Sequence, residues 1–375
     1  MKRFLTLLSV IVLLAVLSPP ASAQDENDFY AEQFKNSGAD GLENALPDGT
    51  KAFFEENGID PSDYNWVNGI TTKNVFSHIV EFIKSGFKKP LKAGAQLTAL
   101  IIIAAALAAA ELKGSTANAS LYAAALSAAA IVAVPTVQTV SACTDALKGV
   151  ATFMLSFVPV FAVITAASGA AATSAAMSGL LLTAAEAVSY ISGFAVMPLM
   201  GGYLALSICG SVSPLIKSSG IAGIIKRFSF WLSALISTVF VGILSIQTAV
   251  NSSADTVVSK TAKFIIGSSV PLAGGALSEA LGTVTASMTL LKSSVGIYGA
   301  VACCAVLLPL LTELLMWRAV FVVCAGVADM FSLPAISGLL RAVDLVFSVL
   351  AGLILLVGAV FVISLAVVVS AGKAQ

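Results

Sequence analysis

Long apolar runs separated by short polar stretches dominate the chain after residue 92. Most of these runs approach the roughly 20 residues that an α-helix needs to cross a bilayer. They are Ala93–Leu112, Ala119–Ser141, Val150–Ala171, Met177–Val212, Phe228–Val250, Ser294–Trp317, Ala319–Phe331 and Val343–Ser370. The pattern predicts an all-α, polytopic membrane protein whose multi-span domain covers residues 93–375, with about 6–8 spans.

Two of the runs do not fit a simple span. Met177–Val212 is too long for one straight crossing and is interrupted by Gly193, Pro198 and a Gly-Gly pair, so it is either one kinked span or two short ones. Ala319–Phe331 is too short to cross alone. It is therefore either re-entrant or continues past Pro334.

The first 23 residues have the three parts of a cleavable signal peptide. Lys2 and Arg3 give a positive start, Phe4–Leu17 is apolar, and Ala21-Ser22-Ala23 fits a cleavage site. The apolar part is short for a span, although an uncleaved anchor is the alternative. We expect the mature chain to begin at Gln24, outside the cytoplasm.

Polar sequence follows this segment up to residue 92. Residues 24–73 are acidic and rich in Asn, Asp and Gly, with short hydrophobic pieces such as Phe53-Phe54 and Trp66. We interpret them as an extracytoplasmic arm that either docks on a partner or is disordered. Residues 74–92 have apolar side chains at helical spacing and lysines near the end, which predicts an amphipathic interfacial helix.

The stretch from Ser252 to Gly296 differs from the other runs. It is apolar enough for a bilayer, but Pro271, Gly274 and Gly275 interrupt it, and ionisable residues are spread along it. Proline removes a backbone donor and glycine weakens a helix, and broken backbone at membrane depth needs protein or water around it. One interpretation is a segment inside the bundle or re-entrant in the membrane. The other is two amphipathic helices on the membrane surface.

Composition supports the membrane assignment and limits the chemistry. The chain is 58% hydrophobic and 11% charged, whereas a soluble domain has about 25% charged residues. The five cysteines lie in or beside apolar runs, so no disulfide framework is expected in the exported part. The single histidine, His78, precedes the spans, and phosphate-loop, zinc-ligand and nucleophile-elbow motifs are lacking. We expect no enzyme activity, no cofactor or metal, and no nucleic-acid partner.

Ionisable residues at membrane depth are the remaining functional candidates, because such charges are costly and usually face a cavity or a partner. Glu186 is the most isolated of them. Glu313 and Arg318 lie near the end of their span and are explained by interfacial anchoring. Arg341 and Asp344 are three residues apart and are explained as a pair on one helix surface. The candidate pathway or structural residues are Glu186, Asp255, Lys263, Pro271, Gly274, Gly275, Glu279 and Lys292.

The C-terminal half resembles the stage III sporulation protein AE family of endospore-forming bacteria. The resemblance covers about Phe230 to Gly372 and is carried by Val241–Gln247, Ser253–Asp255, Lys260–Phe264, Val270–Glu279 and Leu290–Gly296. Glu279 stands where an acidic residue, often aspartate, is expected. Before Phe230 only the layout of signal, arm and spans is similar.

This resemblance implies a specific biology. Family members lie in the mother-cell membrane around the engulfed forespore, in a complex that includes an ATPase and ring-forming subunits. The complex resembles a channel or secretion apparatus between the two cells and supports forespore development. The chain would be its polytopic structural or conduit subunit. The alternatives are a self-sufficient secondary transporter that uses Glu186 and Glu279, and a membrane anchor that only recruits other subunits.

Overall fold

The computed structural model of the chain describes residues 26–63, 66, 86–109, 115–212, 220–225, 227–232, 234–235, 238, 242 and 274–370. Throughout these residues the regular structure is helical and contains no strand. Five of the described helices are long and apolar enough to cross a membrane. The all-α polytopic class predicted from the sequence is therefore confirmed.

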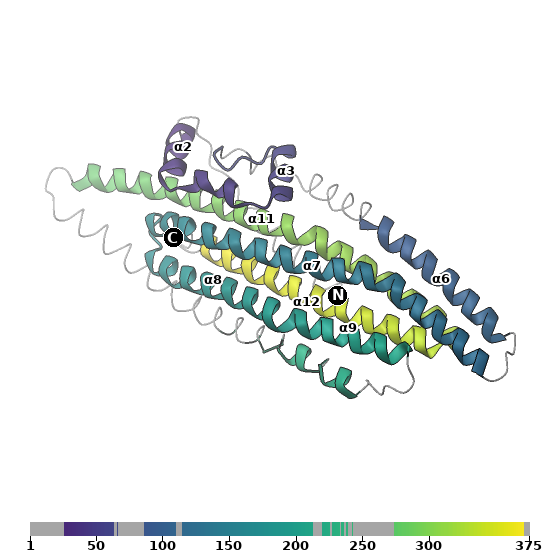
Figure 1. Cartoon of the computed structure of the whole chain (residues 1–375). Helices are drawn as coiled ribbons and strands as arrows, with labels where there is room; N and C mark the ends of the chain where they lie inside the picture. The colour runs from purple at the N-terminus through teal and green to yellow at the C-terminus, as the bar shows by residue number, and fades with distance from the viewer. Residues whose placement is uncertain are drawn as a thin grey trace.

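An elongated helical bundle with a small helical arm on one side makes up the fold (Figure 1). The arm contains α2 (Glu26–Asn36), the 3-10 helix η1 (Ala39–Ala45) and α3 (Asp48–Glu56). The bundle contains α6 (Lys88–Ala109), α7 (Ser115–Ala167), α8 (Ala171–Ile191), the π-helix η2 (Ser192–Val196), α9 (Met197–Val212), α11 (Gly274–Met330) and α12 (Pro334–Ser370).

Two divisions predicted between spans are absent. Helix α7 is continuous over 53 residues, so Ala119–Ser141 and Val150–Ala171 belong to one helix. Helix α11 has 57 residues and joins Ser294–Trp317 to Ala319–Phe331. Charged residues stand at both predicted divisions: Asp145 and Lys148 on α7 and Arg318 on α11. They make the helix surface more polar but remove no backbone hydrogen bond. Charged residues of this kind are ordinary helix formers, unlike proline or glycine.

The tract Met177–Val212 is one continuous helical run, and the alternative of two separate short helices is wrong. Helix α8 passes into the five-residue π-helix η2 and then directly into α9. The π-helix lies immediately before Pro198, which cannot donate the backbone hydrogen bond of a regular α-helix. Single π-helical turns of this kind are a common way to absorb such a defect.

Tight C-terminal caps make the two helix hairpins. Ala170 N–H donates to the Thr165 carbonyl at 3.2 Å and Gly169 N–H to Ala166 at 3.1 Å, with Gly169 at φ +90°. The α11–α12 turn repeats this pattern, because Leu333 N–H donates to Ala328 and Ser332 N–H to Asp329. Both are Schellman caps, but Ser332 occupies the left-handed position, which usually belongs to glycine.

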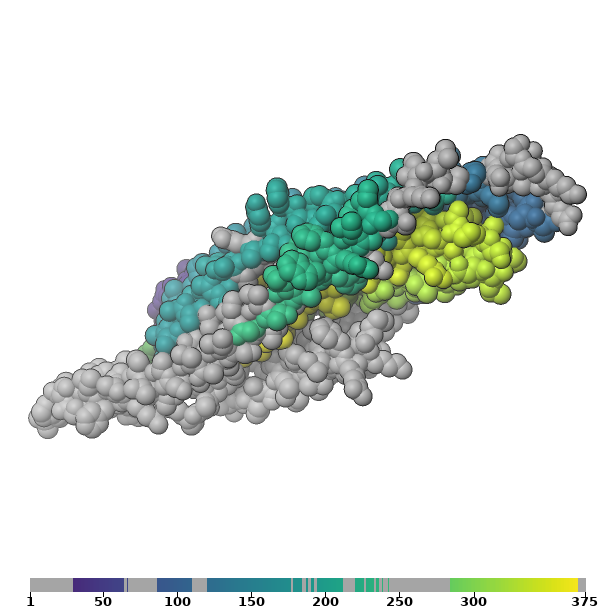
Figure 2. All heavy atoms as spheres, turned by 90° about the horizontal axis from the view of Figure 1, so that it is seen from below, coloured from purple at the N-terminus to yellow at the C-terminus, as the bar shows by residue number. Residues whose placement is uncertain are grey.

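Helix α12 runs antiparallel to α11 and forms the centre of the bundle, where α7, α8 and α9 also pack against it. None of its side chains from Leu353 to Val369 is exposed. Seen from below, α8 and α9 form the outer surface beside the C-terminal helices (Figure 2). The apolar length of α12 therefore reflects burial in protein and does not by itself require lipid.

Candidate functional site

The N-terminal arm folds back onto the bundle and does not extend away from it. Its hydrophobic residues Tyr30, Phe34, Leu42 and Phe54 are almost fully buried. The hydroxyl of Tyr30 donates to the carbonyl of Pro61 at 3.0 Å, which closes the arm on itself. From the sequence, these hydrophobic residues indicated either a partner-binding or a disordered segment. In the structure they are buried against helices α7 and α11 of the same chain.

An aromatic cluster joins the arm to α11. The indole N–H of Trp66 donates to the hydroxyl of Ser294 at 3.1 Å, and this hydrogen bond is buried. The ring of Tyr298, one turn further along α11, meets Phe54 edge-on at 5.0 Å and Trp66 at 6.3 Å. Such aromatic pairs add about 0.5–1.5 kcal/mol each beyond the area that they bury. We call Phe54, Trp66, Ser294 and Tyr298 the arm clamp.

Two glycines allow close helix packing behind the arm clamp. A Cβ atom on Gly299 would lie 2.4 Å from the ring of Phe157, and one on Gly296 would lie 2.3 Å from Val369 and 3.3 Å from Phe161. These distances show that α11 contacts both α7 and α12 through its bare backbone. Small residues permit this approach, which brings whole helices into van der Waals contact.

Lys292 is the predicted site residue that the structure describes most fully. Its side chain is completely buried, and it lies one turn before Gly296 on the same face of α11. Gly296 and Gly299 on this face contact α7 and α12, whereas Ser294 and Tyr298 of the arm clamp lie on the other side of α11. An ammonium group is costly to remove from water unless it is paired, so this position demands a specific environment.

The other predicted site residues are placed less completely. Gly274 and Gly275 are the first residues described in α11, and the break expected at Pro271 lies outside the described residues. Glu279 lies on α11 and Glu186 on α8, but their side chains are outside the described part of the chain. Asp255, Lys263 and Pro271 lie outside the described residues altogether.

Ion pairs link α11 to α12, in place of the local pair expected within one helix. Arg318 Nε contacts Asp344 Oδ1 at 2.8 Å, with both side chains largely shielded. Arg341 pairs with Asp329, and both are more exposed. Glu313 instead accepts a hydrogen bond from the indole of Trp317 at 3.4 Å. The expected pair Arg341–Asp344 is wrong because the antiparallel partner helix offers each residue a closer counter-charge.

The arm clamp and the glycine seam were not identified from the sequence. Trp66 was noted only as a hydrophobic piece, and Gly296 only as the end of the broken stretch. The spacing of Gly296 and Gly299 is a weak signal of close packing, because small residues are frequent throughout this chain. In the described ranges, no group of three His, Cys, Asp or Glu side chains is placed to hold a metal ion. The arrangement is thus one of helix and arm packing, with a single buried cation.

Comparison with known proteins gives a consistent result. The family described as stage III sporulation protein AE matches residues 67–372. A protein named stage III sporulation protein AE from Bacillus subtilis (strain 168) is 27% identical over 238 residues, which is 62% of this chain and 59% of that relative. The match thus spans less than two thirds of the relative's own length. No solved structure matches the chain.

Proposed function

Because the chain belongs to the stage III sporulation protein AE family, we propose that it is the membrane-embedded structural or conduit subunit of a complex linking mother cell and forespore. In this role it is needed for forespore development after engulfment. Its membrane is the mother-cell membrane around the forespore, with the signal peptide removed and the arm outside the cytoplasm. Its partners are other stage III proteins, including an ATPase and ring-forming subunits.

The observation that carries this proposal is the arm clamp. A self-sufficient transporter does not need a polar arm packed against its longest helix. A subunit that holds other proteins does need a rigid surface outside the bilayer. The clamp supplies that rigidity, because Trp66 and Phe54 fix the arm to Ser294 and Tyr298 on α11. Acidic side chains of the arm, including Glu43, Asp48 and Glu55, stay exposed and are free to meet basic surfaces.

Residues 274–296 act in this proposal as packed framework. At Gly296 and Gly299 the backbone of α11 lies too close to α7 and α12 to leave a pathway between these helices. Any conduit is formed between subunits, with this chain as one wall.

A clean deletion of the gene in a spore former tests the proposal. We expect development to stop after engulfment, with few heat-resistant spores, and we expect complementation by the wild-type gene. Complementation by a Trp66→Ala variant that accumulates normally should be impaired, since the arm is no longer held. A normal spore yield in the deletion strain would refute the proposal.

A second experiment separates the subunit from a transporter. Purified protein in sealed vesicles should move no solute on its own, and Glu279→Gln should leave the vesicles unchanged. Solute uptake abolished by Glu279→Gln would support the transporter instead. Full activity of a chain truncated through residues 24–73 would argue against any role of the arm in assembly.

A further inference from the structure

The longest helices are too long for one bilayer. Helix α7 has 53 residues and α11 has 57, which correspond to about 80 and 86 Å at 1.5 Å per residue. The hydrocarbon core of a bilayer is about 30 Å thick, and helix tilt adds only a modest fraction to this length. Roughly half of each helix must therefore lie outside the hydrocarbon. The structure contains several markers that decide which half.

Two halves of the bundle need names. The arm-covered half comprises Gly149–Ala167 of α7, α8, Val284–Cys303 of α11 and Leu353–Val369 of α12. The distal half comprises α6, Ser120–Ser141 of α7, α9, Cys304–Met330 of α11 and Pro334–Ala351 of α12. The α7–α8 turn, the beginning of α11 and the end of α12 lie at the left of Figure 1, and the α11–α12 turn lies at the right.

The position of the arm shows which part of the bundle lies in the aqueous phase. It contacts α11 at Ser294 and Tyr298, and Pro47 lies 3.3 Å from the position that a Cβ atom on Gly149 of α7 would take. The opposite face of the arm exposes several carboxylates: Glu32, Glu43, Asp48, Glu55 and Glu56. Charges at the bilayer centre are strongly disfavoured. The level of the arm therefore lies outside the hydrocarbon.

A ring of exposed charge lies between the two halves. Lys88, Lys89 and Lys92 are exposed on the first turns of α6, and Asp145 and Lys148 are exposed on α7. A Cβ atom on Gly86 would lie 3.9 Å from Glu313 on α11, which places the start of α6 at that level. Asp145 lies about three turns before Phe157, and Glu313 lies about four turns after Gly299, the glycine that Phe157 contacts. These charges therefore share one level, as interfacial lysines and carboxylates do.

Exposed side chains differ on the two sides of this ring. In the distal half α6, α7 and α11 expose many large aliphatic side chains, interspersed with alanines and a few polar residues: Ile102, Ile103, Leu107, Leu126, Val134, Val137, Val322 and Val323. In the arm-covered half fewer exposed side chains are large, namely Leu155, Val163, Tyr190 and Val284. Most of its other exposed positions on α7 and α8 are small or hydroxylated: Thr152, Ser156, Ala166, Ala167, Ala171, Ala175, Gly179 and Thr183. The distal half is therefore richer in the branched aliphatic side chains that favour contact with acyl chains.

We propose that the bilayer surrounds the distal half alone, and that the arm-covered half projects from the membrane on the side of the arm. From Lys92 to Ala109, α6 covers about 26 Å, close to the hydrocarbon thickness. From Gly149 to Ala167, α7 extends about 27 Å beyond the charged ring. The uncharged segment Gly149–Ala167 of α7, which belongs to a candidate span by hydropathy, is on this proposal packed protein outside the membrane, together with α8.

The path of the chain follows from this placement. Helices α6, α7, α9, α11 and α12 each cross the bilayer once, so the arm, the α7–α8 turn, Gly274 and Ser370 lie on one side. The α11–α12 turn and Val212 at the end of α9 lie on the other side. Since α9 ends on the side opposite to Gly274, the chain crosses once more between them. Phe228–Val250, most of which lies outside the described residues, is the stretch between them for which the sequence predicts a crossing.

Cysteine accessibility in the full-length protein tests the proposal. Two exposed alanines on α7, Ala130 in the distal half and Ala166 in the arm-covered half, give matched variants with minimal change in side-chain volume. The background carries Cys209→Ala, because Cys209 is an exposed native cysteine. Purified protein is placed in sealed vesicles of phosphatidylethanolamine and phosphatidylglycerol and treated with a membrane-impermeant maleimide. Asp48→Cys on the arm reports which side the arm occupies.

We expect A166C to react at least roughly tenfold faster than A130C, since thiolate formation requires water. A166C and D48C should share the same sidedness, and A130C should react only after detergent is added. Protection of A166C together with reaction of A130C would overturn the proposal, as would protection of both. If either variant fails to accumulate, Ala175→Cys and Ala123→Cys replace it on the same criterion. The result does not depend on sporulation, so it leaves the proposed function standing or falling separately.

Discussion

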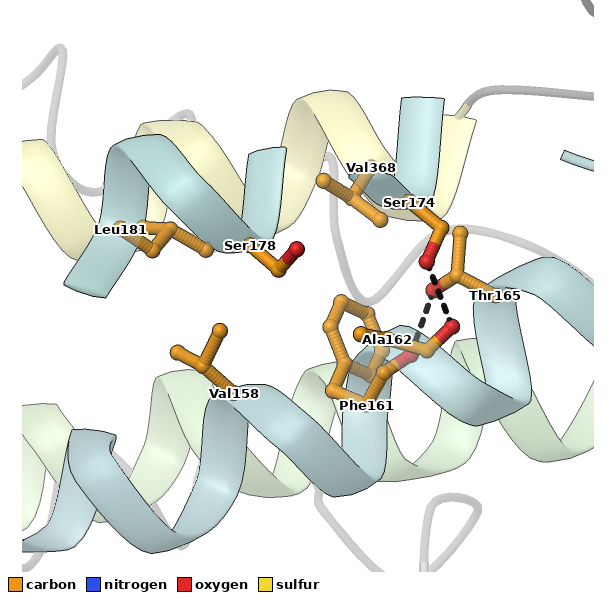
Figure 3. Close-up of a pocket in the computed structure, with 8 residues that line it drawn as sticks. All are labelled: Val158, Phe161, Ala162, Thr165, Ser174, Ser178, Leu181 and Val368. Atoms are coloured by element: carbon orange, nitrogen blue, oxygen red, sulfur yellow. Dashed lines mark hydrogen bonds between the residues drawn. The ribbon is translucent and has the colours of Figure 1, made fainter. Parts of the chain in front are cut away.

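The arm-covered half and the distal half are both apolar, but they are held together differently. In the arm-covered half, α11 contacts its neighbours through Gly296 and Gly299. The hydroxyl of Ser174 on α8 donates a hydrogen bond to the carbonyl of Ala162 on α7 at 2.6 Å (Figure 3). In the distal half, helices α11 and α12 are joined by the ion pair Arg318–Asp344. Beside this pair, Trp317, Phe321 and Phe347 pack their rings at 5.4–6.3 Å.

This difference shows that a hydrophobic segment need not be in contact with lipid. A half that packs through bare backbone and short hydroxyl side chains can be apolar because protein covers it. A half that displays branched aliphatic side chains outward is apolar because lipid covers it. The two cannot be distinguished by mean hydropathy, since both lack charge over long stretches.

The largest effect is expected from removing the side chain of Trp66, which holds the arm against α11. The variant Trp66→Ala loses the hydrogen bond to Ser294 and the edge contact with Tyr298. Truncating a buried tryptophan costs about 3–5 kcal/mol. We expect the arm to detach, which limited trypsin digestion would show as fast cleavage after Lys35 and Lys51.

Tyr298→Phe is the matched control for this experiment. The Tyr298 hydroxyl is buried and has no hydrogen-bond partner among the described residues. Removing an unsatisfied hydroxyl while keeping the ring should leave the arm attached or hold it more firmly. Slow cleavage in both variants would show that the arm clamp does not hold the arm.

The glycine seam is the next most sensitive feature of the same half. In Gly299→Ala the new methyl group would meet the Phe157 ring at 2.4 Å, so the two helices must move apart. Overpacking of this kind costs about 1–3 kcal/mol, and we expect a lower Tm in thermal unfolding in detergent. Gly352→Ala on α12 is the control, because its Cβ has open space, and it should leave Tm unchanged or raise it. An equal loss in both variants would contradict the seam.

In the distal half the corresponding change is Asp344→Asn. This variant removes the charge opposite Arg318 in a site where both side chains are about three-quarters shielded. Hydrogen bonds to charged groups are worth about 1.5–3 kcal/mol, and partial exposure places this pair at the lower end. We therefore expect a moderate fall in Tm. Asp329→Asn, in the exposed pair with Arg341, should change Tm much less, and the reverse order would refute this assignment.

The smallest expected effect is a gain in stability. Ser332 adopts φ 58° in the α11–α12 turn, which strains any residue with a Cβ atom. We expect Ser332→Gly to raise stability by a few tenths to about 1 kcal/mol, because glycine adopts this conformation without strain. A small rise in Tm without a change in secondary structure would confirm it. Ser337→Gly, which lies inside α12, should lower Tm instead.

Much of the fold was predictable from local patterns. Apolar runs of bilayer length identified the helices of the bundle. The candidate site was less predictable. Lys292 was singled out for its charge in an apolar run, but its complete burial depends on helices that are distant in sequence and leave no local signal.

The sequence by itself determined that this protein is helical, that its helices are apolar and where a family signature lies, because these properties depend on side-chain chemistry and periodicity within one segment. Only the tertiary structure decided that the predicted spans on α7 and on α11 join into single helices, that Arg318 pairs with Asp344, and that the arm covers Ser294 and Tyr298. Each of these features is a contact between residues far apart in the chain. Its free energy depends on distance and burial, and neither is written in the local order of residues.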